Sequence, residues 1–315
     1  MSRNWIRYIK LTTGDGNQSY DVSNMRIKFR ISHKTTQTPN IADFTIYNLS
    51  AQTANAIFQQ RNSRVRLEAG YQDNHGKIYE GWVQQKYKGR ETPTETFVMI
   101  RSQDGDKAYN NATNNETLKA GSSAQDVNKA AFKSMQKQDE TLTQGYNGLE
   151  SIFSKIIYPQ PFVMRGMSRK FLRDITHTAK GLWFITNGKL TFIKRKDDSI
   201  PGGPIEVNAA TGMIGSPLQT YEGVKVRALI NPNFEVGRLL RLNNDSIQAG
   251  QLDLSNQDAF STSSSTLPGL SPSGTYRILY IDWVGDTHGI PWYAEIDCNA
   301  VENPTPLPLQ GRLPA

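Results

Sequence analysis

Apolar and polar residues alternate with a period of two through much of the first hundred residues, and this alternation most restricts how the chain can fold. In residues 25–31, every second residue is apolar and the residues between them are basic. Such alternation is typical of strands that bury one face. It marks five candidate strands: 25–31, 42–47, 65–71, 78–85 and 96–101.

One short helix is expected among these strands. Ser50 is a good N-cap for a helix over about 51–60, whose apolar residues fall on one side. Several antiparallel strands crossed by one helix predict a small β-barrel or closed sandwich over residues 1–105.

Residues 106–200 have a different pattern and predict a small α+β domain. The polar stretch 106–121 is expected to be a linker or surface loop. Three helices are expected after it: one capped by Ser122 or Ser123 and reaching about Gln136, one opened by a capping box at 147–150, and one capped by Ser168 with Gly181 as its left-handed C-terminal cap.

The clearest local signal is a hairpin. Two apolar runs, 182–186 and 189–194, are separated only by Asn187 and Gly188. Both residues of a two-residue hairpin turn need positive φ, which Asn-Gly tolerates best. The sequence therefore predicts two adjacent antiparallel strands here.

A third region, 201–302, follows Pro201-Gly202-Gly203-Pro204 and is again strand-rich. Strands are expected over 223–230, 237–242, 276–285 and 292–300, with a long polar loop over 243–274. Because this region and 1–105 share a similar plan, we expect a mainly β chain with α+β content: two small, tube-like β-barrels flanking the α+β domain. Residues 303–315 are rich in proline and are expected to form an extended tail.

Charge and cysteine content suggest a protein made in a reducing compartment. The 36 basic and 29 acidic residues give a net charge of +7, spread along the chain. The densest cluster, Lys194 to Lys196, is followed at once by Asp197 and Asp198, which favours a solvated turn. The single cysteine, Cys298, lies in a strand-like run and is interpreted as a small buried residue. Neither a signal peptide nor a membrane-spanning segment is expected.

The sequence offers no clear catalytic, cofactor or metal site, so we expect no enzyme activity. His33, His75, His177 and His288 lack the spacing of a zinc site. Asp104-Gly105-Asp106 lacks the closing Glu of a calcium loop, and Gly14-Asp15-Gly16 lacks the third glycine of a dinucleotide site; both are interpreted as turns.

Two alternatives stay open. Glu80, Glu150 and Asp174 are candidate carboxylates for a peptidoglycan hydrolase. Tyr87, Lys88 and Arg90 place an aromatic residue among basic groups, as in nucleic-acid-binding proteins, although a solvated strand edge explains the same run.

In residues 42–50 a strand ends in Tyr-Asn-Leu-Ser before a short helix, and the strand 65–71 and then Tyr79-Glu80-Gly81-Trp82-Val83 follow. In these motifs the chain resembles the baseplate hub proteins of bacteriophages. The 183–193 hairpin and the 285–292 segment also match the pattern of that family. The resemblance covers roughly residues 25–300, and the matching motifs are structural.

The resemblance implies a structural subunit of a contractile tail. Three chains would form a ring whose six barrel-like domains join the spike to the tail tube, and closed symmetry would cover exposed sheet edges. Implied partners are the spike protein, the tail tube or a tube-initiator protein, and the tape-measure and wedge proteins. DNA would be present only in transit through the lumen. The subunit would assemble in the host cytoplasm and reside in the virion.

Overall fold

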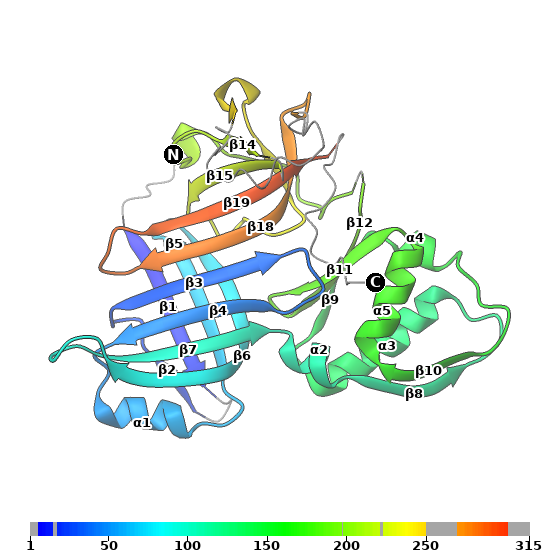
Figure 1. Cartoon of the computed structure of the whole chain (residues 1–315), viewed down its shortest axis with the longest axis horizontal. Coiled ribbons are helices and arrows are strands. Elements are labelled where there is room, and N and C mark those ends of the chain that lie inside the picture. The colour runs from blue at the N-terminus through cyan, green and yellow to red at the C-terminus, as the bar shows by residue number, and fades with distance from the viewer. Residues whose placement is uncertain (1–5, 15–17, 197, 221–222, 250–269, 302–315) are drawn as a thin grey trace, which may run out of the picture.

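The computed structural model describes residues 6–14, 18–196, 198–220, 223–249 and 270–301, and it is mainly β (Figure 1). Fourteen of the described strands form one large sheet. A smaller unit of helices and short sheets lies at one side of it (Figure 1). In the described part of the chain, no helix is long and apolar enough to cross a membrane.

The N-terminal half of the large sheet comes from the alternating runs of the sequence. Their inward residues, such as Ile31, Phe44, Leu67 and Ile100, are fully buried. All five predicted strands are confirmed, and Ser50 accepts a hydrogen bond from the Thr53 amide as the predicted N-cap. The elements are β1 (Arg7–Gly14), β2 (Ser19–Asp21), β3 (Ile27–Lys34), β4 (Asn40–Tyr47), α1 (Ala51–Gln59), β5 (Arg64–Tyr71), β6 (Asn74–Arg90) and β7 (Thr96–Asp104).

The C-terminal half supplies the other seven strands. The four predicted strands are present, the second of them shorter than expected. Residues 250–269 of the predicted polar loop and the predicted tail lie outside the described residues. The elements are β13 (Ile205–Glu206), η1 (Ala209–Thr211), β14 (Leu218–Thr220), β15 (Gly223–Leu229), β16 (Leu239–Arg241), η2 (Asn244–Ser246), β17 (Gln248–Ala249), β18 (Thr275–Asp286) and β19 (Trp292–Ala300).

A direct seam joins the two halves. β18 pairs with β3 in antiparallel register, from Tyr280 opposite Lys34 to Asp286 opposite Lys28. The main strand order is β17-β14-β15-β19-β18-β3-β4-β7-β6-β5-β1-β2, and no ladder among the described strands joins its two ends. The observed sheet is therefore continuous and open, while closure into two barrels stays a prediction.

The two halves also share one hydrophobic core. Trp292 of β19 packs edge-on against Phe29 of β3, with ring centroids 5.5 Å apart, and its indole N–H donates to the Gly70 carbonyl of β5 at 3.2 Å. Segments more than 200 residues apart in sequence are thus tied together by both backbone pairing and side-chain packing.

Residues 106–194 build the smaller unit around a second core cluster. α3 and α5 pack together in it, and both are amphipathic with one buried side. The elements are α2 (Asp106–Asn111), β8 (Thr113–Leu118), α3 (Ala124–Gln138), β9 (Thr143–Asn147), α4 (Glu150–Phe153), β10 (Phe162–Met167), α5 (Ser168–Thr178), β11 (Gly181–Thr186) and β12 (Lys189–Lys194).

Several local predictions in this unit are wrong. The stretch 106–121 is not a loop, because it contains α2 and β8. No capping box opens α4, which begins after Leu149. Ser168 does not cap α5; its buried hydroxyl donates to the Asn114 amide oxygen at 2.7 Å. Lys180, rather than Gly181, takes the left-handed conformation after α5, at φ 53°.

Two other local predictions are confirmed. Ser123 forms a capping box with Asp126 at the start of α3. The Asn187-Gly188 turn joins β11 to β12 with φ of 53° and 73°, as a two-residue hairpin requires.

Candidate functional site

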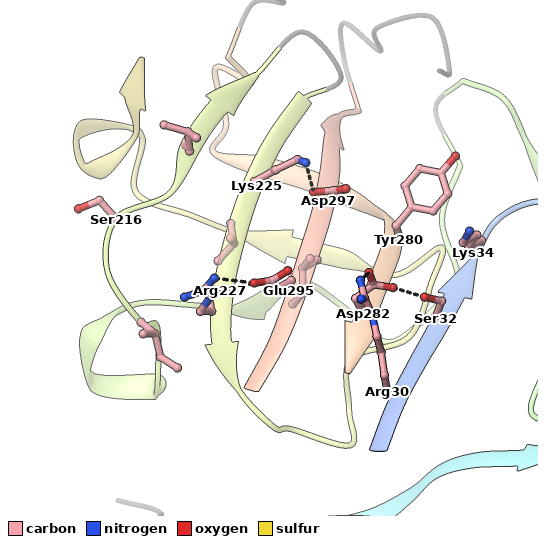
Figure 2. A pocket seen from close by; sticks show the side chains of 14 residues that line it. Arg30, Ser32, Lys34, Ser216, Lys225, Arg227, Tyr280, Asp282, Glu295 and Asp297 are labelled. Atoms are coloured by element: carbon pink, nitrogen blue, oxygen red, sulfur yellow. Dashed lines mark hydrogen bonds and ion pairs between the residues drawn. The ribbon is translucent and has the colours of Figure 1, made fainter. Parts of the chain in front are cut away.

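The candidate site is a groove on the outward face of the sheet at the seam between its halves. β15, β19, β18 and β3 lie side by side there, and their outward residues alternate with the core residues beneath (Figure 2). The groove has a volume of about 670 Å³. We call this surface the seam groove.

Cross-strand ion pairs line the seam groove (Figure 2). Arg227 of β15 lies opposite Glu295 of β19, with an N–O distance of 2.6 Å, and Lys225 lies opposite Asp297 at 3.9 Å. Opposite charges facing each other across neighbouring strands favour this register.

The same arrangement continues across the seam. Asp282 of β18 lies 3.4 Å from Arg30 of β3 and also accepts a hydrogen bond from the Ser32 hydroxyl. Such exposed pairs contribute at most about 1 kcal/mol each. The groove is thus a polar, charge-compensated surface and adds little to stability.

A second cluster fixes the smaller unit to the sheet, and we call it the hairpin clamp. Asp104, at the end of β7, is 1% exposed and accepts hydrogen bonds from the amides of Asn187 and Gly188 in the hairpin turn, the latter at 3.1 Å. Burial raises the pKa of Asp104 from 3.8 to about 7, although the two amide hydrogen bonds oppose this shift.

Arg277 of β18 completes the clamp from the C-terminal half. Its guanidinium, 4% exposed, donates to the carbonyl oxygens of Lys194, Arg195 and Asp198 at 3.1, 2.7 and 2.9 Å. The predicted solvated turn at 194–196 therefore has exposed side chains and a backbone that binds a buried arginine. Asp104 of the N-terminal half and Arg277 of the C-terminal half therefore both bind the backbone of the β11–β12 hairpin and the residues that follow it.

The four histidines lie on separate elements. His33 is in the core, stacked on Tyr79 with centroids 6.1 Å apart, and burial lowers its pKa from 6.5 to about 4. His75 stacks on Tyr8 at 3.8 Å. His177 is exposed at the end of α5, and the backbone N–H of His288 donates to Asp286 in the β18–β19 loop. The described residues contain no group of potential metal ligands.

The candidate hydrolase carboxylates lie on three different elements. Glu80 on β6 pairs with Arg64 and Lys77, each at 2.9 Å. Glu150 begins α4 and Asp174 is exposed on α5. No observation in the described part of the chain pairs any two of these carboxylates.

The candidate nucleic-acid run lies at the outer end of β6. Tyr87 donates to Gln85, Lys88 donates to Asn55 of α1 and lies over the Phe58 ring, and Arg90 donates to the Pro93 carbonyl. These contacts are local, as expected of a solvated strand edge.

Cys298 is buried as predicted, and its thiol donates to the Val224 carbonyl at 3.1 Å. Burial raises the pKa of this thiol, which keeps it protonated. In the Gly14-Asp15-Gly16 run, Gly14 ends β1 and the other two residues lie outside the described part.

Solved structures with a similar fold come from phage tails and secretion systems. The 43 kDa tail protein of prophage MuSo2 from Shewanella oneidensis superimposes with a TM-score of 0.56 at 8% identity, covering 95% of this chain and 100% of that one. A tail protein from Neisseria meningitidis gives 0.54 at 8% identity, with 92% and 96% covered. A chain in the Francisella PdpA–VgrG complex gives 0.55 at 8% identity, with 96% and 60% covered. At such identities the likeness establishes the fold alone.

Sequence comparison identifies the family. No curated protein matches this chain. The model of the family described as Baseplate hub gp41 matches residues 8–247, which include all of the N-terminal half, the smaller unit and the start of the C-terminal half. The chain therefore belongs to the baseplate hub gp41 family and is a structural protein of the bacteriophage tail baseplate.

Proposed function

We propose that three copies of this chain form a closed ring that connects the central spike to the tail tube. The observation that carries the proposal is the continuous sheet, in which two strand-rich halves meet at the β3–β18 seam. Each copy then supplies two sheet modules, so that three copies present six. We propose residues 1–105 and 201–302 as these tube-like modules, with barrel closure completed in the ring.

The ends of the sheet support this arrangement. Its terminal strands, β2 and β17, are three and two residues long in the part of the chain that the structure describes, which ends at residue 249 on the β17 side. Exposed strand edges tend to pair with other chains, and short edge strands limit that pairing until the correct partner is present. A closed ring in which every copy makes the same contacts leaves no free end for fibre growth.

The spike is the proposed partner below the ring. Among the structures of similar fold, one is the PdpA–VgrG complex, and another is a type VI secretion component of E. coli described as similar to the T4 tail proteins gp27 and gp5, with a TM-score of 0.50 at 9% identity, covering 90% and 76%. The tail tube or its initiator would bind above. Tape-measure and wedge proteins are further proposed partners, and DNA would pass through the lumen.

Mass measurement in solution tests the ring. We expect a species of three times the 35.3 kDa chain mass for the protein alone at high concentration, or, after addition of its spike or tube partner, a complex that contains three copies of the chain. Light scattering on a concentration series, with and without the partners, reads this directly. A strictly monomeric protein that neither partner converts would contradict the proposal.

We also propose that the chain acts without catalysis, in the virion, after assembly in the host cytoplasm. The engagement of Glu80 in ion pairs with Arg64 and Lys77, and the placement of Glu150 and Asp174 on two other elements, support this proposal. Zymography on peptidoglycan is expected to show no clearing by the purified chain, at loads where lysozyme clears the gel. Clearing by the wild type would contradict the proposal. If a Glu80→Gln, Glu150→Gln, Asp174→Asn variant no longer cleared the gel, these carboxylates would form the hydrolase site; if it still cleared the gel, the site would lie elsewhere.

A further inference from the structure

Basic and acidic residues both occur along the whole chain, but the excess of basic over acidic residues lies in the smaller unit. Residues 106–200 contain 15 Lys and Arg against 9 Asp and Glu, so this segment carries +6 of the chain's net +7. The rest of the chain is nearly neutral. The excess is thus a property of one structural unit rather than of the whole molecule.

Ion pairing divides the molecule in the same way. Every ion pair between described residues joins two residues outside 106–200. The sheet neutralises its cations internally, as the seam groove shows (Figure 2). The described cations of the smaller unit form no ion pair, although some make other contacts: Lys107 lies over the Trp82 ring and Arg169 over the Tyr109 ring.

Helix α3 arranges three of these cations in a row. Lys129, Lys133 and Lys137 are exposed and four residues apart, so they follow one another along one side at intervals of about 6 Å. The opposite side of α3 is buried through Val127 and Met135. Like charges at this spacing destabilise an isolated helix, so the row is not explained by folding of the helix.

The strand ribbon beside α3 extends this surface. The Asn114 side chain of β8 donates to the Ala130 carbonyl at 3.1 Å, and the Ser134 hydroxyl donates to the Thr113 carbonyl at 2.7 Å, which fixes β8 against the helix. β8 pairs with β10, as Figure 1 shows at the outer end of this unit.

The outward side of β10 is apolar and basic. Val163 and Met167 are 63% and 36% exposed, and the exposed Arg165 lies between them on the same side of the strand. We call α3 residues 129–137 together with the outward side of β8–β10 the basic face.

We propose that the basic face is a docking surface for an acidic protein partner of the baseplate. Exposed aliphatic side chains beside Arg and Met are typical of protein interfaces, whereas surfaces that bind the DNA backbone are more polar. The lysine row would provide charge complementarity and faster association, and Val163 and Met167 would be covered by the partner. The proposed docking does not depend on ring formation. Binding of a probe to the basic face can be measured whatever the number of copies in the ring.

The test uses the full chain and three probes: poly-glutamate, a glutamate–tyrosine copolymer, and duplex DNA of matched charge. The variant K129Q/K133Q/K137Q is expected to bind the copolymer about tenfold more weakly at low salt, since each exposed charge contact contributes modestly. The variant K129R/K133R/K137R, which keeps the charges, is expected to bind like the wild type.

A matched control removes three cations from the sheet. R66Q/K77Q/R101Q changes the net charge equally but removes only cations of the sheet that are ion-paired and lie outside the seam groove, so its affinity is expected to stay within about twofold. Val163→Ser is expected to weaken binding of the copolymer and to leave poly-glutamate binding unchanged. An equal loss of affinity in the sheet control, or no loss in the α3 variant, would contradict the proposal that the basic face binds the partner. DNA binding tighter than copolymer binding, or no effect of Val163→Ser on copolymer binding, would contradict the proposal that the partner is a protein.

Discussion

Replacing Trp283 with alanine is expected to lower the free energy of unfolding by about 3–5 kcal/mol, the range for truncation of a large buried aromatic side chain. Trp283 is 1% exposed and lies in the middle of β18, opposite Ile31 of β3 and Ala294 of β19. No described atom accepts a hydrogen bond from its indole N–H, so the loss is one of packing at the seam. Denaturant unfolding followed by circular dichroism measures it.

The matched control is the next residue of the same strand. Val284 points outward and is only partly buried, so Val284→Ala is expected to cost less than about 1 kcal/mol. If the seam unites the halves, Trp283→Ala should shift one cooperative transition, and amide exchange should accelerate in both β4 and β15. Destabilisation confined to the C-terminal half would show that the halves fold independently.

Two buried groups are expected to give the wild type opposing pH responses between about pH 4 and 6.5. Asp104, whose pKa rises to about 7, keeps its proton in the folded state while the unfolded chain loses it. Its stabilising contribution is full below about pH 4 and is lost as pH rises towards 7. A shift of about three pKa units corresponds to roughly 4 kcal/mol.

His33 has the opposite sign. Its pKa falls to about 4 because it is buried, so the unfolded chain binds a proton between pH 6.5 and 4 that the folded protein does not. Stability from this group is therefore lost as pH falls through that interval, by roughly 3 kcal/mol. Because both windows overlap, the two contributions nearly cancel there.

Single variants separate the two responses. Relative to the wild type, Asp104→Asn is expected to gain stability as pH rises from 4 to 6.5, because only the His33 response is left. His33→Phe, which keeps a ring stacked on Tyr79, is expected to lose stability over the same interval. Urea unfolding at several pH values gives both difference curves. Two flat curves would show that neither group titrates abnormally.

The alternation that predicted the sheet could have located one half of the hairpin clamp. Val98, Ile100 and Ser102 point inward on β7, and the same period places Asp104 inside, although the sequence around it resembles a polar turn. Its partners could not be predicted, because the Asn187-Gly188 turn lies more than 80 residues away. The local sequence pattern predicts that a strand residue is buried. Tertiary packing decides which residues it contacts.

The differences between the predicted and observed elements within 106–200 have the same origin. The sequence does not predict β8, because Asn114 and Glu116 occupy positions where a buried strand would carry apolar residues. Ser168 has the chemistry of an N-cap, yet a buried partner, Asn114, takes its hydroxyl. Charge along the chain does not reveal the lysine row on α3; the row forms only when the helix brings every fourth residue to one side.

Electron microscopy of the assembled baseplate tests the hub assignment most directly. We expect three copies of this chain around the tail axis, between spike and tube, each with its β3–β18 seam intact. Density for this chain at the periphery, or in a copy number that is not three, would contradict it.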